Sequence, residues 1–121
     1  MNEPLPITDR TFEFGIRIVK LCQVLDEKPG VGRTLAKQLL KAGTSIGANV
    51  EEAQSGQSKA DFVHKMEISL KEARETKYWL KLLIATNLIP ETRLNSIIKE
   101  SDELIKIIAS IIVKTKQNLQ N

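Results

Sequence analysis

The sequence of 121 residues contains few of the residues that most catalytic and extracellular proteins depend on. Aromatic residues make up 4% of it, and it holds one cysteine and one histidine. A single cysteine cannot form an internal disulfide. So few aromatic residues also argue against a β-sandwich, whose core is rich in them. The longest apolar run, residues 104–113, is interrupted by Lys106 and Ser110 and is well short of the roughly 20 residues that span a bilayer.

The N-terminal segment gives no sign of export. Residues 1–10 carry an early acid, two prolines and no apolar run, unlike a secretory signal. Together with the lone Cys22, this predicts a cytoplasmic protein that does not interact with a membrane. We expect residues 1–7 to form a flexible N-terminal arm.

Catalytic and metal-binding motifs are also scarce. A di-iron carboxylate bundle needs two Glu-x-x-His motifs, and the chain offers only Asp61 and His64 at that spacing. Cys22 and His64 fall on different predicted helices with no third group to orient them, which disfavours a nucleophilic pair. The Gly-Val-Gly of residues 30–32 lacks the Lys-Ser/Thr ending of a phosphate-binding loop. The sequence therefore predicts no enzymatic activity, no cofactor and no metal site.

The chain is rich in leucine and isoleucine at helical spacing. Apolar residues recur at steps of three and four along four segments, as they do on the buried face of a helix. Turns rich in Pro, Gly and Ser separate these segments. We expect helices at about residues 8–26, 33–54, 59–86 and 90–117. Because the connections are short, successive helices must run antiparallel, which predicts an all-α, up-down-up-down four-helix bundle over residues 8–118.

The last predicted helix is apolar over too wide an arc for one core. Ile107 and Ile111 cannot both face the core that Ile105 and Ile112 face. Exposed apolar patches of that size usually mark a partner surface. We therefore expect a homo-oligomer that forms through Ile97, Ile107 and Ile111.

The charge of the chain is small but unevenly placed. Net charge is +3 at pH 7, yet residues 28–50 contain four cations and no acid. Antiparallel order brings the start of the second helix and the end of the third to one pole of the bundle. A basic pole favours phosphate backbones, because each neutralised phosphate releases counterions. The candidate nucleic-acid-binding residues of this pole are Arg33, Lys37, Lys41, Arg74, Lys77 and Lys81.

On the second and third predicted helices, small and polar residues lie beside the apolar residues that are expected to face the core. Gly43 and Gly47 each cost about 0.5–1 kcal/mol of helix propensity relative to alanine, and close approach by another helix would explain their presence. Polar residues run beside them, and a hydrogen-bond network between the two helices would fix their register. The residues of this predicted interhelical network are Ser45, Asn49, Glu52, Glu72 and Thr76.

The same two helices resemble a known family. TSIGANVEEAQSG (residues 44–56) and DFVHKMEISLKEARETKYWLKLL (residues 61–83) resemble segments of small four-helix-bundle proteins encoded in intervening sequences of bacterial 23S rRNA genes. That family is similar to the accessory protein of diversity-generating retroelements. The resemblance implies a four-helix protomer, a cyclic homopentamer, a role in binding RNA or DNA, and no catalytic activity.

Three functions remain open on this evidence. The first is a homo-oligomer whose basic pole binds nucleic acid, with RNA favoured over DNA. The second is a scaffold that docks a partner protein, such as a polymerase or a reverse transcriptase. The third is a small-molecule pocket lined by Asn49, Glu52 and Glu72.

Overall fold

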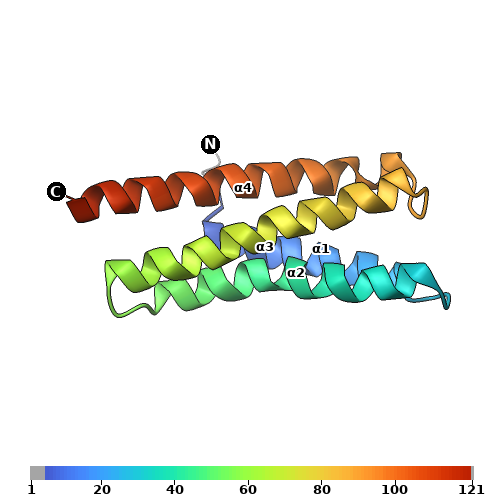
Figure 1. The fold of residues 1–121 in the computed structure, drawn as a ribbon, viewed down its shortest axis with the longest axis horizontal. Helices are drawn as coiled ribbons and strands as arrows, with labels where there is room; N and C mark the ends of the chain where they lie inside the picture. Colours follow the sequence, from blue (N-terminus) through green and yellow to red (C-terminus); the bar gives the residue numbers. More distant parts are fainter. Residues whose placement is uncertain (1–4, 121) are drawn as a thin grey trace.

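The computed structural model describes residues 5–120 and shows four helices and no strand over that range (Figure 1). The helices are α1 (Ile7–Leu25), α2 (Val31–Gln54), α3 (Lys59–Ala85) and α4 (Glu91–Gln120). Successive helices run antiparallel (Figure 1), so the predicted all-α four-helix fold is confirmed. Most of the predicted N-terminal arm lies outside the described residues, and its last member, Ile7, is already helical.

The helices begin and end at residues with recognisable turn chemistry. Gly30, just before α2, has a φ of +131°, which favours glycine. Ser58 caps α3, where its side-chain oxygen accepts a hydrogen bond at 3.1 Å from the backbone N–H of Asp61. Asn87 follows α3 in the left-handed region at φ 60°, a conformation that asparagine tolerates better than most residues. These signals explain why the predicted ends lie within three residues of the observed ones.

All four helices contribute apolar side chains to one core. A buried cross-helix hydrogen bond joins α3 to α2, where the Ser69 hydroxyl donates to the Ile46 carbonyl at 2.9 Å. Every buried side-chain nitrogen and oxygen among the described residues has a hydrogen-bond partner. The core therefore offers no orphaned polar group for a ligand to satisfy. Its largest fully buried apolar side chains are Phe14, Ile18, Leu39, Ile46, Val50, Met66, Leu80, Leu83, Leu94, Leu104 and Ile108.

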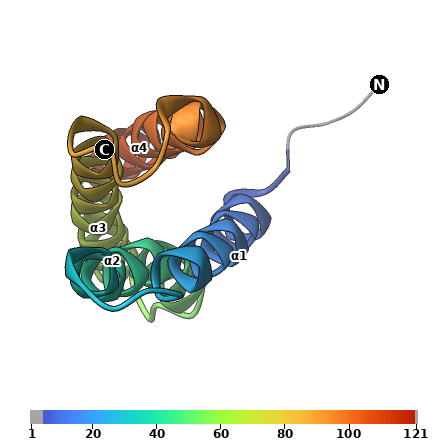
Figure 2. The same ribbon diagram turned by 90° about the vertical axis from the view of Figure 1, so that its right-hand side faces the viewer.

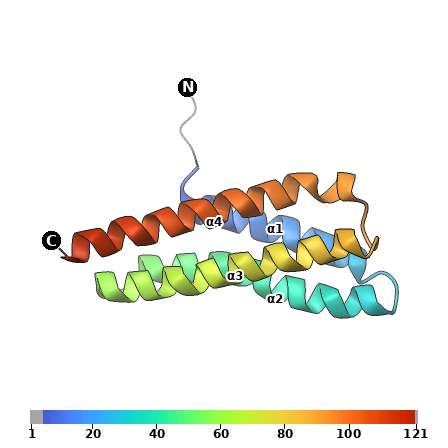
Figure 3. The ribbon, with the colours of Figure 1, turned by 45° about the horizontal axis from the view of Figure 1, so that its top comes forward.

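The helices follow one another around the core as an incompletely closed ring (Figure 2). Each helix packs extensively on its sequence neighbour, but α1 and α4 touch little. We call this edge the α1–α4 seam. Arg10 bonds Glu100 across it at 2.7 and 3.0 Å, and Arg17 bonds Ser96 at 2.9 Å. Figure 3 shows the α1–α2 and α3–α4 turns at one end of the molecule and the α2–α3 turn at the other.

The expected oligomer contact on α4 is partly wrong. Ile97 is only 4% exposed and belongs to the core of the protomer, so it cannot present a surface to another subunit. Ile111 is half-buried and packs against that core, and Ile107 is half-buried as well. The wide apolar arc of α4 is therefore covered largely within its own chain.

Candidate functional site

The α1–α2 and α3–α4 turns lie at one end of the molecule (Figure 3), and the chain segments at that end are rich in lysine and arginine. We call this half the basic end and define it as residues 17–41 and 74–99. It contains eleven Lys and Arg against four Asp and Glu, while the rest of the chain contains seven against eleven. The basic end thus carries a formal charge of +7 and the remainder −4. This division agrees with the basic pole expected from the sequence.

Two of the six predicted cations of this end already have partners. The guanidinium of Arg33 lies 3.1 Å from the carboxylate of Asp26 and donates to the Asp26 backbone carbonyl at 2.7 Å. Lys77 lies 2.6 Å from the carboxylate of Asp102 on α4. Both cations therefore hold elements of the bundle together.

The other four predicted cations point in two directions. Lys37 and Lys41 are exposed on α2. Arg74 lies three residues before Lys77 and Lys81 lies four residues after it. Residues at those spacings lie on the same side of a helix. They therefore lie on the α4 side of α3, since Lys77 reaches α4. The structure divides the predicted set between two surfaces.

Sequence reasoning missed a third group of cations, which meets in the α1–α4 seam. Arg17 and Lys20 of α1 and Arg93 of α4 line one cavity of about 220 Å³. None of the three forms an ion pair with a carboxylate among the described residues. The only other residues lining the cavity are apolar: Leu21, Val24, Leu94 and Ile97. The sequence shows that each residue is charged, but it does not show that Arg93 of α4 lies beside Arg17 and Lys20 of α1.

The predicted polar network between α2 and α3 is wrong in its connections. Ser45 donates to the Lys41 carbonyl at 2.6 Å, and Asn49 donates to the Ser45 carbonyl at 2.8 Å. Thr76 donates to the Glu72 carbonyl at 2.7 Å. Each of these bonds stays within its own helix, because hydroxyl and amide groups readily bond the carbonyl four residues back.

The two acids of that predicted network also do not meet. Glu52 accepts a hydrogen bond at 2.8 Å from Lys65 on α3. Burial raises the pKa of Glu72, and the nearby charge of Glu75 raises it further, while Lys71 and Lys41 oppose the shift. None of the four cavities described for residues 5–120 is lined by Asn49, Glu52 or Glu72, so the small-molecule hypothesis gains no support.

The close helix approach expected at the two glycines is confirmed, and the approaching helix is α1. A methyl group built on Gly43 would lie 2.7 Å from Cγ2 of the buried Ile18. One built on Gly47 would lie 3.2 Å from the carbonyl oxygen of Thr11. Glycine at position 43 lets the Ile18 side chain pack against α2, and glycine at position 47 lets the backbone of α1 approach at Thr11.

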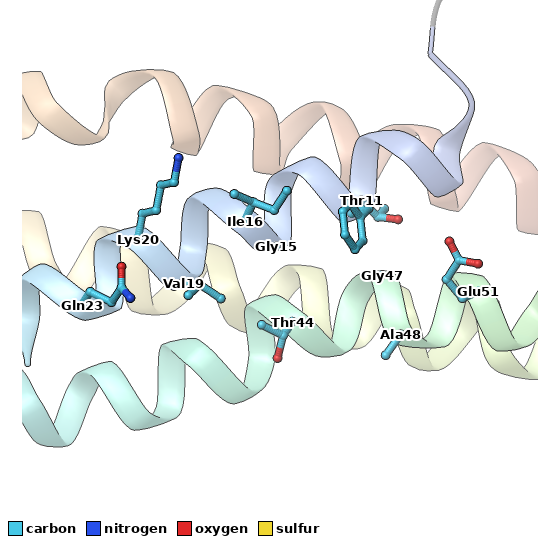
Figure 4. Close-up of a pocket in the computed structure, with 11 residues that line it drawn as sticks. Thr11, Gly15, Ile16, Val19, Lys20, Gln23, Thr44, Gly47, Ala48 and Glu51 are labelled. Atoms are coloured by element: carbon cyan, nitrogen blue, oxygen red, sulfur yellow. The ribbon is translucent and has the colours of Figure 1, made fainter.

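An apolar groove of about 580 Å³ runs along the outside of this contact (Figure 4). Phe12, Ile16 and Val19 of α1 are 65%, 42% and 39% exposed there, and their spacing places them on one side of the helix. Among residues 5–120, Lys20 and Glu51 are the only charged residues that line it, and they lie toward opposite ends (Figure 4). We call it the α1–α2 groove. It is lined by Thr11, Phe12, Gly15, Ile16, Val19, Lys20, Gln23, Thr44, Gly47, Ala48 and Glu51.

The residues that could support catalysis or metal binding are separated. Cys22 is buried, its thiol donates to the Ala36 carbonyl at 3.4 Å, and burial raises its pKa to about 11. His64 is exposed on α3. Over residues 5–120 there is no cluster of three or more His, Cys, Asp or Glu that could hold a metal ion. None of the helices described there is long and apolar enough to cross a membrane.

Comparison with known proteins places the chain in a family. Residues 3–110 match the family model of the 23S rRNA-intervening sequence protein. A crystal structure of a protein of unknown function from the S23 ribosomal protein family of Bacteroides thetaiotaomicron is 46% identical, with a TM-score of 0.82. The match covers 88% of this chain and 98% of that one. No curated protein matches the chain. The resemblance carried by α2 and α3 is thus confirmed, and the chain belongs to the 23S rRNA-intervening sequence protein family.

Proposed function

We propose that the protein is a non-enzymatic, homo-oligomeric nucleic-acid-binding protein of the cytoplasm, with RNA preferred over DNA. The charge division between the two ends carries this proposal. An end with a formal charge of +7 beside a remainder of −4 attracts a polyanion to one region and repels it from the other. Each phosphate that a Lys or Arg neutralises releases counterions, which favours binding. The preference for RNA follows the family's association with rRNA intervening sequences.

Binding of labelled RNA and of DNA with the same sequence tests this function. Fluorescence anisotropy titrations between about 50 and 200 mM salt should show log affinity falling linearly with log salt concentration. RNA should bind more tightly than DNA at each salt concentration. A wild-type protein that binds neither at the lowest salt would refute the proposal and favour the alternative of a scaffold for a partner protein.

The oligomer, in this proposal, assembles through the α1–α2 groove instead of through α4. The groove exposes three large apolar side chains and has charge only toward its ends, so it suits an apolar protein surface and not a phosphate backbone. A second copy of the chain is the occupant that the family resemblance supports, as one subunit of a cyclic pentamer. In a ring the contacts run head to tail, so the groove of one subunit receives a different face of the next.

Light scattering after size-exclusion chromatography tests the assembly. Wild-type protein should elute as an oligomer, and the double variant Phe12→Glu, Val19→Ser should elute as a folded monomer. Val31→Ser is the matched control, because Val31 is 68% exposed but lies outside the groove, and it should keep the wild-type mass. A monomeric wild type, or an oligomer that survives the double variant, would contradict the proposed interface.

A further inference from the structure

We infer that the α1–α4 seam holds a binding site for a backbone phosphate of nucleic acid, formed by Arg17, Lys20 and Arg93. The inference rests on the proposed nucleic-acid function. It assigns the phosphate contact to residues outside the α2 and α3 cations that the sequence suggested.

The cavity has the chemistry that a phosphate requires. Three cations from two helices line it, and no carboxylate does. Its volume of about 220 Å³ is several times the roughly 30 Å³ that one water molecule occupies, so a phosphate group and some of its waters fit. The apolar floor of Leu21, Val24, Leu94 and Ile97 lowers the local dielectric and strengthens attraction between the cations and an anion.

The side chains are already directed to the seam. Arg17 donates a hydrogen bond from Nη2 to the Ser96 hydroxyl at 2.9 Å, which holds its guanidinium across the seam toward α4. A guanidinium has five N–H donors, so most remain for a ligand. Figure 4 shows the Lys20 side chain leaving α1 on the side away from α2, and Lys20 also lines the seam cavity.

Within residues 5–120, the three cations that line the cavity are not engaged by a carboxylate that would compete with a ligand. Arg10 and Lys77 pair with carboxylates of α4, and Arg33 pairs with Asp26. Arg17, Lys20 and Arg93 have no such pair among the described residues. Like charges at close quarters repel one another, and a bound phosphate relieves that repulsion.

A polyanion suits the position of the cavity better than a small anion does. The cavity lies inside the basic end, which also holds further cations of α2, α3 and α4. A strand seated there by one phosphate can place its neighbouring phosphates near those cations, and each such contact adds counterion release.

A matched pair of triple variants tests the site. Arg17→Gln, Lys20→Gln, Arg93→Gln removes the three cations, and Lys59→Gln, Lys106→Gln, Lys114→Gln removes the same charge from exposed, unpaired residues outside the basic end. The probe is a fluorescein-labelled single-stranded RNA, titrated at about 50 to 200 mM salt. The site variant should bind about fivefold more weakly near 0.1 M salt, with a salt slope smaller by about 0.7, since the site neutralises one phosphate and each single-strand phosphate contact contributes about 0.7. The control should change affinity by less than about threefold.

Further outcomes keep the test decisive. The charge-conserving variant Arg17→Lys, Arg93→Lys should stay within about threefold of wild type, because Lys also binds phosphate as a point charge. Circular dichroism verifies that each protein is folded. Should the site triple unfold, the three single Gln variants give the same test, and each should weaken binding more than the single variants Lys59→Gln, Lys106→Gln and Lys114→Gln do. Equal losses in the site and control variants overturn the seam site while leaving the nucleic-acid function standing. Failure of wild type to bind overturns the function itself.

Discussion

The guanidinium of Arg10 donates two hydrogen bonds to the carboxylate of Glu100, from Nη2 to Oε1 at 2.7 Å and from Nε to Oε2 at 3.0 Å. The two side chains are 20% and 21% exposed, so water screens the pair only in part. The hydrogen bond to Glu100 raises the pKa of Arg10. The pair joins the N-terminal part of α1 to the middle of α4, where the two helices otherwise touch little.

A double-mutant cycle on this pair should reveal strong coupling. Arg10→Gln and Glu100→Gln each break the bidentate contact, and the double variant should lose less stability than the sum of the singles. We expect a coupling energy of about 1 kcal/mol, since bidentate charged hydrogen bonds are among the stronger surface interactions. Urea unfolding of the four proteins measures it. Additive losses would show that the pair contributes nothing specific, for example because Glu103, 3.6 Å from Arg10, replaces Glu100.

Gly43→Ala should destabilise the bundle although alanine is the better helix former. The added methyl would lie 2.7 and 2.8 Å from two side-chain carbons of Ile18, and Ile18 is fully buried, so it cannot move aside cheaply. Overpacking of this kind costs about 1–3 kcal/mol, which exceeds the gain in helix propensity of about 1 kcal/mol. We therefore expect a net loss of up to about 2 kcal/mol in thermal or urea unfolding.

The variant Ile18→Ala tests whether the methyl group added at position 43 clashes with the Ile18 side chain. The double variant Gly43→Ala, Ile18→Ala should lose less stability than the two single variants together, because truncation of Ile18 makes room for the new methyl. Gly43→Ala at wild-type stability would mean that α1 shifts away from α2 without cost.

Glu72→Gln should stabilise the protein in a pH-dependent way. Burial and the charge of Glu75 raise the pKa of Glu72, so the folded state disfavours the ionised carboxylate. That penalty is present above the folded pKa and disappears as pH falls below the unfolded value of about 4.3. We expect the Gln variant to be more stable at pH 7 by up to about 0.5 kcal/mol, and the difference to vanish near pH 4. A Gln variant that is no more stable than wild type at pH 7, or whose advantage is the same at pH 4, would contradict this account.

Cys22 should be unreactive until the protein opens. Burial raises the thiol pKa to about 11, so only about one molecule in a thousand carries the reactive thiolate at pH 8. Iodoacetamide should therefore label the native protein slowly and the urea-unfolded protein quickly, as mass spectrometry can follow. Rapid labelling of native protein would show that α1 separates from α2 more easily than its packing suggests.

The sequence predicted the structure best at residue types that are favoured in one kind of position, such as glycine, proline and serine at helix ends. The turn residues around Gly30, Ser58 and Pro90 placed the helix ends within three residues. Gly43 and Gly47 indicated a close helix contact, because glycine within a helix costs stability relative to alanine. Helix count followed from the apolar periodicity together with the turn signals, and antiparallel order followed from the short connections.

Direction around a helix was harder to predict. Phe12, Ile16 and Val19 are apolar at helical spacing and yet face outward, while Ile97 was expected outside and is buried. Periodicity shows that a helix has an apolar face, but a helix with two such faces needs its neighbours to decide which one is covered. The cluster of Arg17, Lys20 and Arg93 depends in the same way on where α4 lies beside α1.

The weak contact between α1 and α4 also bears on how the chain folds. Nearly all packing joins helices that are consecutive in sequence, α1 with α2, α2 with α3 and α3 with α4, so each contact closes only a short loop. Chains with such local contacts fold in microseconds to milliseconds, because little loop entropy is lost before the contacts form. The α2–α3 hairpin, the central pair of this series, can form a nucleus onto which α1 and α4 add in either order.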